Sequence, residues 1–189
     1  MKKIQIGIMG SAGNEEYPQN NKKRNTLYKL AEELGEILGK KKIILFTGGK
    51  GGIMESASKG AKQFGGTTIG VVKGKDRNTC NKYIDIEIVS GMEGCGEETM
   101  LILSCDGIIA LGGGAGTLQE LTIAYRNKKP VVILDINYGW ASKLKGSYLD
   151  ERKNEKFVVA TNPEEAVNKI LDAIKRKRNS SINSKKSLQ

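Results

Sequence analysis

Short β-branched runs alternate with helix-type patterns along nearly the whole chain, and this alternation constrains the fold more than any other feature. Seven runs predict strands, at residues 4–9, 42–47, 67–72, 83–89, 106–111, 130–135 and 157–160. Between most of them, apolar spacings of three and four predict helices at residues 20–39, 52–64, 96–104, 117–127 and 163–177. The alternation predicts an α/β fold with a single doubly wound, mainly parallel sheet and helices on both faces.

The chain has the length of one domain, and its charge is unevenly spread. Its 189 residues can bury one sizeable core, whereas two domains would each be small. We expect the domain to span residues 1–174 and a basic, disordered tail to span residues 175–189. The tail has no acid and six cations: Lys175, Arg176, Lys177, Arg178, Lys185 and Lys186. Removing these six from a net charge of +10 leaves +4, so we do not expect nucleic acid as a partner.

Several kinds of site are excluded by what the chain lacks. It has no histidine, which rules out Ser-His-Asp and Cys-His nucleophiles and any histidine-ligated metal. Cys80, Cys95 and Cys105 are odd in number and widely spaced, so we expect no disulfide, no zinc site and no bound metal. No apolar run reaches the roughly 18 residues of a membrane span, and the N-terminus lacks a signal-peptide core. We therefore expect a cytoplasmic protein without a membrane partner.

Glycines cluster at three corners, each of which follows or overlaps a predicted strand. The first corner is residues 7–14 (GIMGSAGN), the second is 46–55 (FTGGKGGIME) and the third is 108–121 (IIALGGGAGTLQEL). Glycine lets the backbone approach a ligand closely, and the free N–H groups of a helix start attract anions. Because ligands bind at the carboxyl ends of strands in such sheets, the corners predict a phosphate site.

The third corner also fits a purely structural role. Its TLQE segment matches a capping box, in which the Thr117 hydroxyl caps the amide of Glu120 and the Glu120 carboxylate bonds to the amide of Thr117. Neither a P-loop nor a dinucleotide-binding fingerprint fits any of the corners. The third corner alone leaves phosphate binding and capping both open, but a second glycine-rich helix start favours a ligand.

Two segments of the chain resemble a known superfamily. Residues 47–61 (TGGKGGIMESASKGA) and 104–134 (SCDGIIALGGGAGTLQELTIAYRNKKPVVIL) are similar to the Rossmann-like LOG cytokinin-activating phosphoribohydrolases, long mislabelled lysine decarboxylases. The same superfamily includes the molybdenum-cofactor carrier proteins and part of DprA. The resemblance covers residues 3–174, and residues 138–144 and 146–152 look most like the shorter branch beside the cofactor carriers. It implies a Rossmann-like fold.

The resemblance also implies a set of site residues. The phosphate of a nucleotide-like ligand, either a nucleoside monophosphate or a molybdopterin-like compound, would bind at Gly112, Gly113, Gly114, Gly116 and Thr117. The rest of the pocket would be lined by Ser11, Gly48, Gly49 and Gly52. Glu120 matches the catalytic glutamate that acts at the N-glycosidic bond in LOG enzymes. Related proteins imply a homo-oligomer, a dimer or tetramer, for which the helix at 117–127 offers an interface. No pyridoxal-phosphate site is expected.

One departure from the LOG pattern decides between two functions. Glu97 and Glu98 align with an Arg-Lys pair of LOG enzymes, and a like charge about 4 Å from a phosphate costs on the order of 4 kcal/mol at an effective dielectric of about 20. The leading hypothesis is therefore binding of a phosphorylated small molecule by backbone amides, as a carrier or sensor. The alternative is a phosphoribohydrolase that cleaves the N-glycosidic bond of a nucleoside 5′-monophosphate. Trp140 either stacks on a base or packs over the sheet edge.

Overall fold

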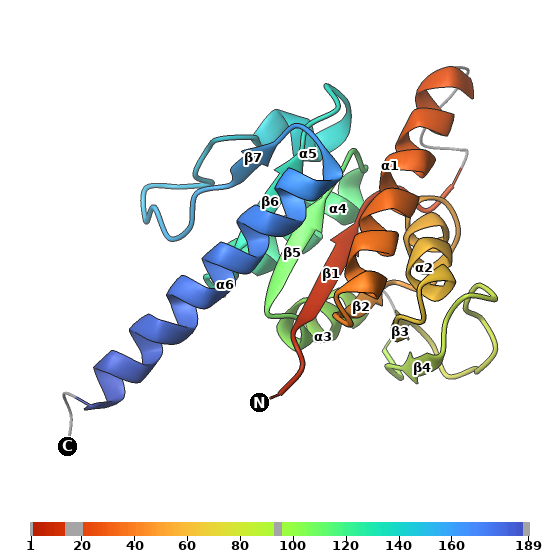
Figure 1. Ribbon diagram of the computed structural model, residues 1–189, viewed down its shortest axis with the longest axis horizontal. Coiled ribbons are helices and arrows are strands. Elements are labelled where there is room, and N and C mark those ends of the chain that lie inside the picture. The colour runs from red at the N-terminus through yellow and green to blue at the C-terminus, as the bar shows by residue number, and fades with distance from the viewer. Residues whose placement is uncertain (1, 14–20, 93–95, 187–189) are drawn as a thin grey trace.

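The computed structural model describes residues 2–13, 21–92 and 96–186, and Cys95 lies outside them. One parallel sheet runs through the molecule in the order β4-β3-β2-β1-β5-β6-β7 (Figure 1). Its strands are β1 (Gln5–Met9), β2 (Ile44–Thr47), β3 (Thr68–Val72), β4 (Ile86–Val89), β5 (Gly107–Ala110), β6 (Val131–Leu134) and β7 (Val158–Ala160). The chain builds the sheet outward from β1 to β4 and then crosses back to β5. The carboxyl end of β1 is therefore the switch point, where such sheets bind ligands.

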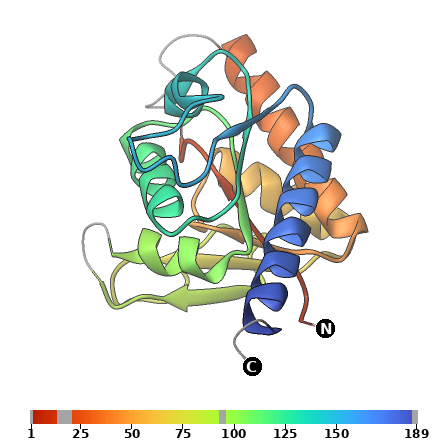
Figure 2. The same cartoon turned by 90° about the vertical axis from the view of Figure 1, so that its left-hand side faces the viewer.

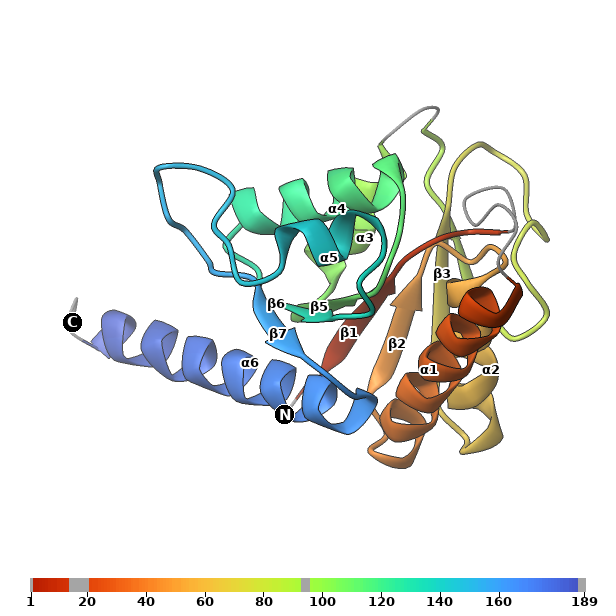
Figure 3. The same cartoon turned by 90° about the horizontal axis from the view of Figure 1, so that it is seen from above.

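Helices cover both faces of the sheet, as Figure 3 shows from above. One face carries α1 (Asn21–Lys40), α2 (Ile53–Gln63) and α6 (Pro163–Lys186), and the other carries α3 (Glu97–Ser104), α4 (Ala115–Arg126) and α5 (Gly139–Leu144). Figure 2 shows α1 and α6 side by side on their face. The predicted doubly wound, Rossmann-like α/β fold is thus confirmed.

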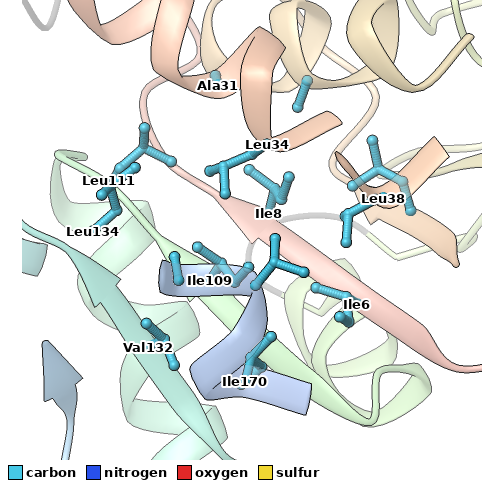
Figure 4. Close-up of a cluster of buried hydrophobic side chains, with 14 of the residues drawn as sticks. Ile6, Ile8, Ala31, Leu34, Leu38, Ile109, Leu111, Val132, Leu134 and Ile170 are labelled. Carbon is cyan, nitrogen blue, oxygen red and sulfur yellow. The ribbon is translucent and has the colours of Figure 1, made fainter. Parts of the chain in front are cut away.

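The core has two halves, one on each face of the sheet, because side chains of a strand alternate in direction. Ile6 and Ile8 of β1 point towards α1 and pack with Leu34 (Figure 4), whereas Met9 packs on the opposite face with Leu121 of α4. All five side chains are at most 1% exposed. Burial of each contributes roughly 1.5–3 kcal/mol, which fixes the strand register and the strand ends that form the site.

The helices differ most from the sequence prediction in α4, α5 and α6. The helix α5 was not predicted, and α4 begins at Ala115, two residues before the predicted start. The last helix was expected to end near residue 177, but α6 continues to Lys186 and so includes residues 175–186 of the basic tail. This stretch has neither proline nor glycine and is rich in Lys and Arg, which favour helix.

No helix within the described part of the chain is long and apolar enough to cross a bilayer.

Candidate ligand-binding site

The three glycine corners meet at one cavity beside the carboxyl ends of β1, β2 and β5. This corner cavity has a volume of about 160 Å³. Its wall includes residues of all three corners: Gly10, Ala12, Gly48, Lys50, Gly116 and Thr117. The end of β3 and the first turns of α3 complete it. The three corners therefore share one edge of the sheet, as the sequence predicts.

The start of α4 shows that the capping box does not form. Gly114 occupies the N-cap position, and no side chain in the described structure caps it. Because the helix starts early, Thr117 occupies the third helical position, from which its hydroxyl cannot act as an N-cap. The first turn also contains no acid. Among the described residues, no side chain accepts from the amides of Ala115, Gly116 and Thr117, so these amides suit an external acceptor, and capping no longer accounts for the TLQE segment.

The start of α2 is locked to the first corner. Gly52 is its N-cap, with φ of 67°, and the amide of Ile53 donates to the Ser11 carbonyl at 3.1 Å. A Cβ on Gly52 would lie 2.5 Å from that carbonyl oxygen, so only glycine fits. The Ser11 side chain is 1% exposed, and its hydroxyl has no hydrogen-bond partner among the described residues. Ser11 and Gly52 therefore build the corner without lining the cavity.

Gly49 contacts the loop after β3 and does not line the corner cavity. Its carbonyl accepts hydrogen bonds from the backbone amide of Asn81 at 2.7 Å and from the Asn81 side chain at 3.0 Å. Its φ is 69°, and an added Cβ would lie 2.5 Å from the Cys80 sulfur. The sequence prediction for Gly49 thus identified a glycine that the fold requires, but one that packs against the loop after β3.

The first glycines of the third corner hold α5 in place. The carbonyls of Gly112 and Gly113 accept hydrogen bonds from the amides of Ala141 at 3.1 Å and Trp140 at 2.9 Å. Both glycines have positive φ, of 64° and 83°. A Cβ on Gly113 would lie 2.2 Å from the hydroxyl oxygen of Thr117. The glycine-rich turn therefore has two sides, with Gly116 and Thr117 facing the corner cavity and the first glycines facing α5.

A second, larger cavity lies on the α5 side of the turn. This α5 cavity has a volume of about 590 Å³ and is walled by Gly113, Gly114, Tyr138, Trp140, Lys143 and Lys145, among others. Lys143 places its ammonium 4.4 Å from the centre of the Trp140 ring. Sequence reasoning considered Trp140 but missed this cavity. The available signal was Gly139, whose positive φ of 70° lets the chain turn closely over Gly112.

Three carboxylates give the corner cavity an acidic side. Glu97, Glu98 and Glu120 all line it, and Glu97 and Glu98 are the pair that the resemblance aligns with the Arg-Lys pair of LOG enzymes. One carboxylate oxygen each of Glu97 and Glu98 is buried without a hydrogen-bond partner in the described structure. Burial raises the pKa of Glu98, and the neighbouring Glu97 raises it further, although Lys50 opposes the change. This side of the cavity favours hydrogen-bond donors over anions.

Metal and thiol chemistry receive no support from the described residues. Within them, no group of three or more His, Cys, Asp or Glu side chains could hold a metal ion. Burial raises the pKa of the Cys80 thiol to about 12 and raises that of Cys105 as well. Neither thiol is therefore ionised at neutral pH, which leaves both unreactive as nucleophiles.

Comparison with known proteins identifies relatives that span nearly the whole chain. The family model described as SLOG cluster4 matches residues 3–167. An "uncharacterized protein" of Archaeoglobus fulgidus is 35% identical over 134 residues, which is 71% of this chain and 82% of that protein.

Solved structures agree with these matches. The protein TM1055 superposes with a TM-score of 0.81 at 28% identity, covering 89% of this chain and 99% of that one. The molybdenum cofactor binding protein of Rippkaea orientalis gives a TM-score of 0.76 at 34% identity, covering 92% and 99%. The Moco carrier protein of Chlamydomonas reinhardtii gives 0.74 at 32% identity, covering 93% and 99%.

Proposed function

This chain belongs to the SLOG cluster4 family, and we propose that it binds a nucleotide-like or other phosphorylated small molecule. The phosphate lies at the first turn of α4, on the amides of Ala115, Gly116 and Thr117. The protein acts as a carrier or sensor of this ligand.

One observation carries the proposal: within the described part of the chain, no side chain caps the start of α4, which lies where the three glycine corners meet around a cavity. Each amide there can donate to a phosphate oxygen, and the helix dipole adds to the attraction. Such charge-assisted hydrogen bonds contribute roughly 1.5–3 kcal/mol each before desolvation is subtracted. Since backbone groups supply them, the acids at Glu97 and Glu98 weaken but do not abolish the site.

The names of the relatives support a carrier role. Proteins that bind or carry the molybdenum cofactor resemble this chain over almost its full length. We therefore include a molybdopterin-like compound with the nucleoside monophosphates as ligand classes. Both combine a planar heterocycle with a phosphate.

The proposal is tested by calorimetry and thermal shift with nucleoside monophosphates, cyclic nucleotides and pterin phosphates. A matched pair of variants at Gly116 locates the site, because a Cβ there would meet nothing within 4 Å. Gly116→Asp places a carboxylate at the amides and should lower affinity at least about tenfold. It should leave the melting temperature unchanged or higher, since an acid suits a first helical turn. Gly116→Ala controls for bulk. Absence of saturable binding across the panel would overturn the proposal.

A second candidate function rests on the position of Glu120, which lines the corner cavity together with Gly116 and Thr117. A carboxylate beside a phosphate site could direct water to C1′ of a nucleoside 5′-monophosphate, so that a C1′–O bond replaces the N-glycosidic bond and the base leaves with a proton, giving free base and ribose 5-phosphate. Chromatography of incubated monophosphates should then show released base, and Glu120→Gln should stop the release while ligand still binds. Protein that binds a monophosphate without releasing base would exclude this function.

A further inference from the structure

The corner cavity is too small for the whole of the proposed ligand. Its volume of about 160 Å³ lies well below the roughly 300–1,000 Å³ of most small-molecule pockets. The α5 cavity, at about 590 Å³, falls within that range. Because Gly114 is both the N-cap of α4 and part of the wall of the α5 cavity, a phosphate on the α4 amides stands at the edge of this second cavity.

The chemistry of the α5 cavity differs from that of the corner cavity. Tyr138 and Trp140 provide aromatic surface, and the partly exposed indole of Trp140 offers a surface for stacking. Lys143 and Lys145 provide positive charge, and none of the described residues that line the cavity is acidic. Lys145 is held in place by Asp135 and Asn137, whereas Lys143 lies over Trp140. Such a surface suits a flat heterocycle that carries ring carbonyl oxygens.

We propose that the α5 cavity binds the planar heterocycle of the ligand, stacked on Trp140, while the phosphate stays on the first turn of α4. This inference rests on the proposed function and adds a second binding site to it. The aromatic side chain supplies a contact that tolerates different rings, because every nucleobase or pterin has a π face. The ammonium of Lys143 lies 4.4 Å from the centre of the indole, and a ring that stacks on this face displaces it to the ring edge, where it can donate to a ring carbonyl. The ligand class is therefore a phosphorylated purine or pterin.

The fluorescence of Trp140 tests this directly, because it is the only tryptophan in the chain. The full-length protein is titrated with GMP and with ribose 5-phosphate, which has the phosphate and sugar but no ring, while calorimetry records both affinities. We expect GMP to change Trp140 emission saturably, at the concentration where calorimetry shows binding. Ribose 5-phosphate should bind about tenfold more weakly and leave the emission nearly unchanged.

Variants of Trp140 separate stacking from damage to the glycine-rich turn. Trp140→Ala should weaken GMP binding about tenfold, the size of one lost stacking contact, and leave ribose 5-phosphate binding unchanged. Trp140→Phe should keep most of the GMP affinity because the ring remains.

Three results would overturn the inference. GMP binding without an emission change, at equal affinity in Trp140→Ala, would leave the proposed function standing and exclude the α5 cavity. An equal loss of GMP and ribose 5-phosphate affinity in Trp140→Ala would assign Trp140 a structural role in the turn. Failure of the native protein to bind either compound would count against both the inference and the proposed function.

Discussion

The two cavities that flank the glycine-rich turn share its backbone but differ in charge. The corner cavity presents Glu97, Glu98 and Glu120 together with Lys50 and Lys73, whereas the α5 cavity presents, among the described residues, only the cations Lys143 and Lys145, beside two aromatic rings. Because the two sides of the turn differ, anchoring of a phosphate and selection of the group attached to it can be carried out by different parts of one site. In the proposed function, backbone amides at the start of α4 fix where the phosphate binds, and the side chains on either side determine what can be attached to it.

This division accounts for the loss of the Arg-Lys pair expected from LOG enzymes. Glu97 and Glu98 replace it on the side where a base-cleaving enzyme would need positive charge near the reacting bond. Lys143 and Lys145 stand across the turn, next to Trp140, where no acid of the described chain lines the cavity. The arrangement fits retention of an intact ligand better than hydrolysis.

The largest expected effect comes from disturbing the turn that both cavities share. Gly113→Ala should lower the free energy of unfolding by about 3 kcal/mol, because Gly113 has φ of 83° and an added Cβ would lie 2.2 Å from the Thr117 hydroxyl. Urea denaturation measures this change. Gly116→Ala, at a position with open space, should change stability far less. Equal losses in the two variants would show that the turn does not impose this constraint.

Removing charge from each cavity should shift affinity in opposite directions. Replacing both Glu97 and Glu98 by Gln should tighten GMP binding about fivefold at moderate ionic strength, because a nearby like charge is removed. Lys143→Gln should weaken binding by about threefold, and Glu33→Gln on the exposed face of α1 serves as a charge control. Calorimetry at two salt concentrations measures these changes. If the double Gln variant bound more weakly, the acids would be contacting the ligand.

The smallest expected effects are opposite dependences of stability on pH. Burial raises the pKa of Glu98 above its usual 4.5. The contribution of Glu98 to the free energy of unfolding is therefore fully present below pH 4.5 and is lost as pH rises through its pKa in the folded state. Near the α5 cavity, burial raises the pKa of Asp135, but the hydrogen bonds from Lys145, Asn137 and Ser142 and the charge of Lys145 together outweigh it, and the net pKa falls below 3.8. Its contribution is present above pH 3.8 and is lost as pH falls through the folded-state value.

Two variants measure these opposite trends. Relative to the native protein, Glu98→Gln should gain stability as pH rises above 4.5, and Asp135→Asn should lose stability at pH 7 but not near pH 3. Each difference should stay within about 1 kcal/mol, because both groups are partly exposed. If the stability of both variants, relative to the native protein, changed with pH in the same direction, the electrostatic contrast between the cavities would be contradicted.

Local sequence patterns predicted the strands and the meeting of the three glycine corners at one edge of the sheet. Runs such as residues 130–135 are rich in β-branched residues and have the length of a buried strand. In a parallel sheet the carboxyl ends of the strands lie at the same edge. The sequence predicted the start of α4 two residues too late. Gly114 and Gly116 have low helix propensity, so Thr117 looked like the N-cap residue. Sequence periodicity thus located the element but not its first turn.

The α5 cavity could not be predicted, for a different reason. The helix α5 has six residues, too few for a helical period to stand out. Its position depends on hydrogen bonds from Trp140 and Ala141 to Gly113 and Gly112, which join residues distant in the sequence. No local pattern encodes such contacts. The resemblance to LOG enzymes did relate Glu97 and Glu98 to Glu120, because alignment with a known family also relates residues that are distant in the sequence.

Backbone amide shifts in ¹⁵N–¹H correlation spectra test the central claim most directly. During a titration with GMP, the amides of Ala115, Gly116 and Thr117 should move saturably and further than those of residues remote from the turn, with the dissociation constant that calorimetry gives. The account would be contradicted if GMP bound saturably by calorimetry while these three amides stayed in place.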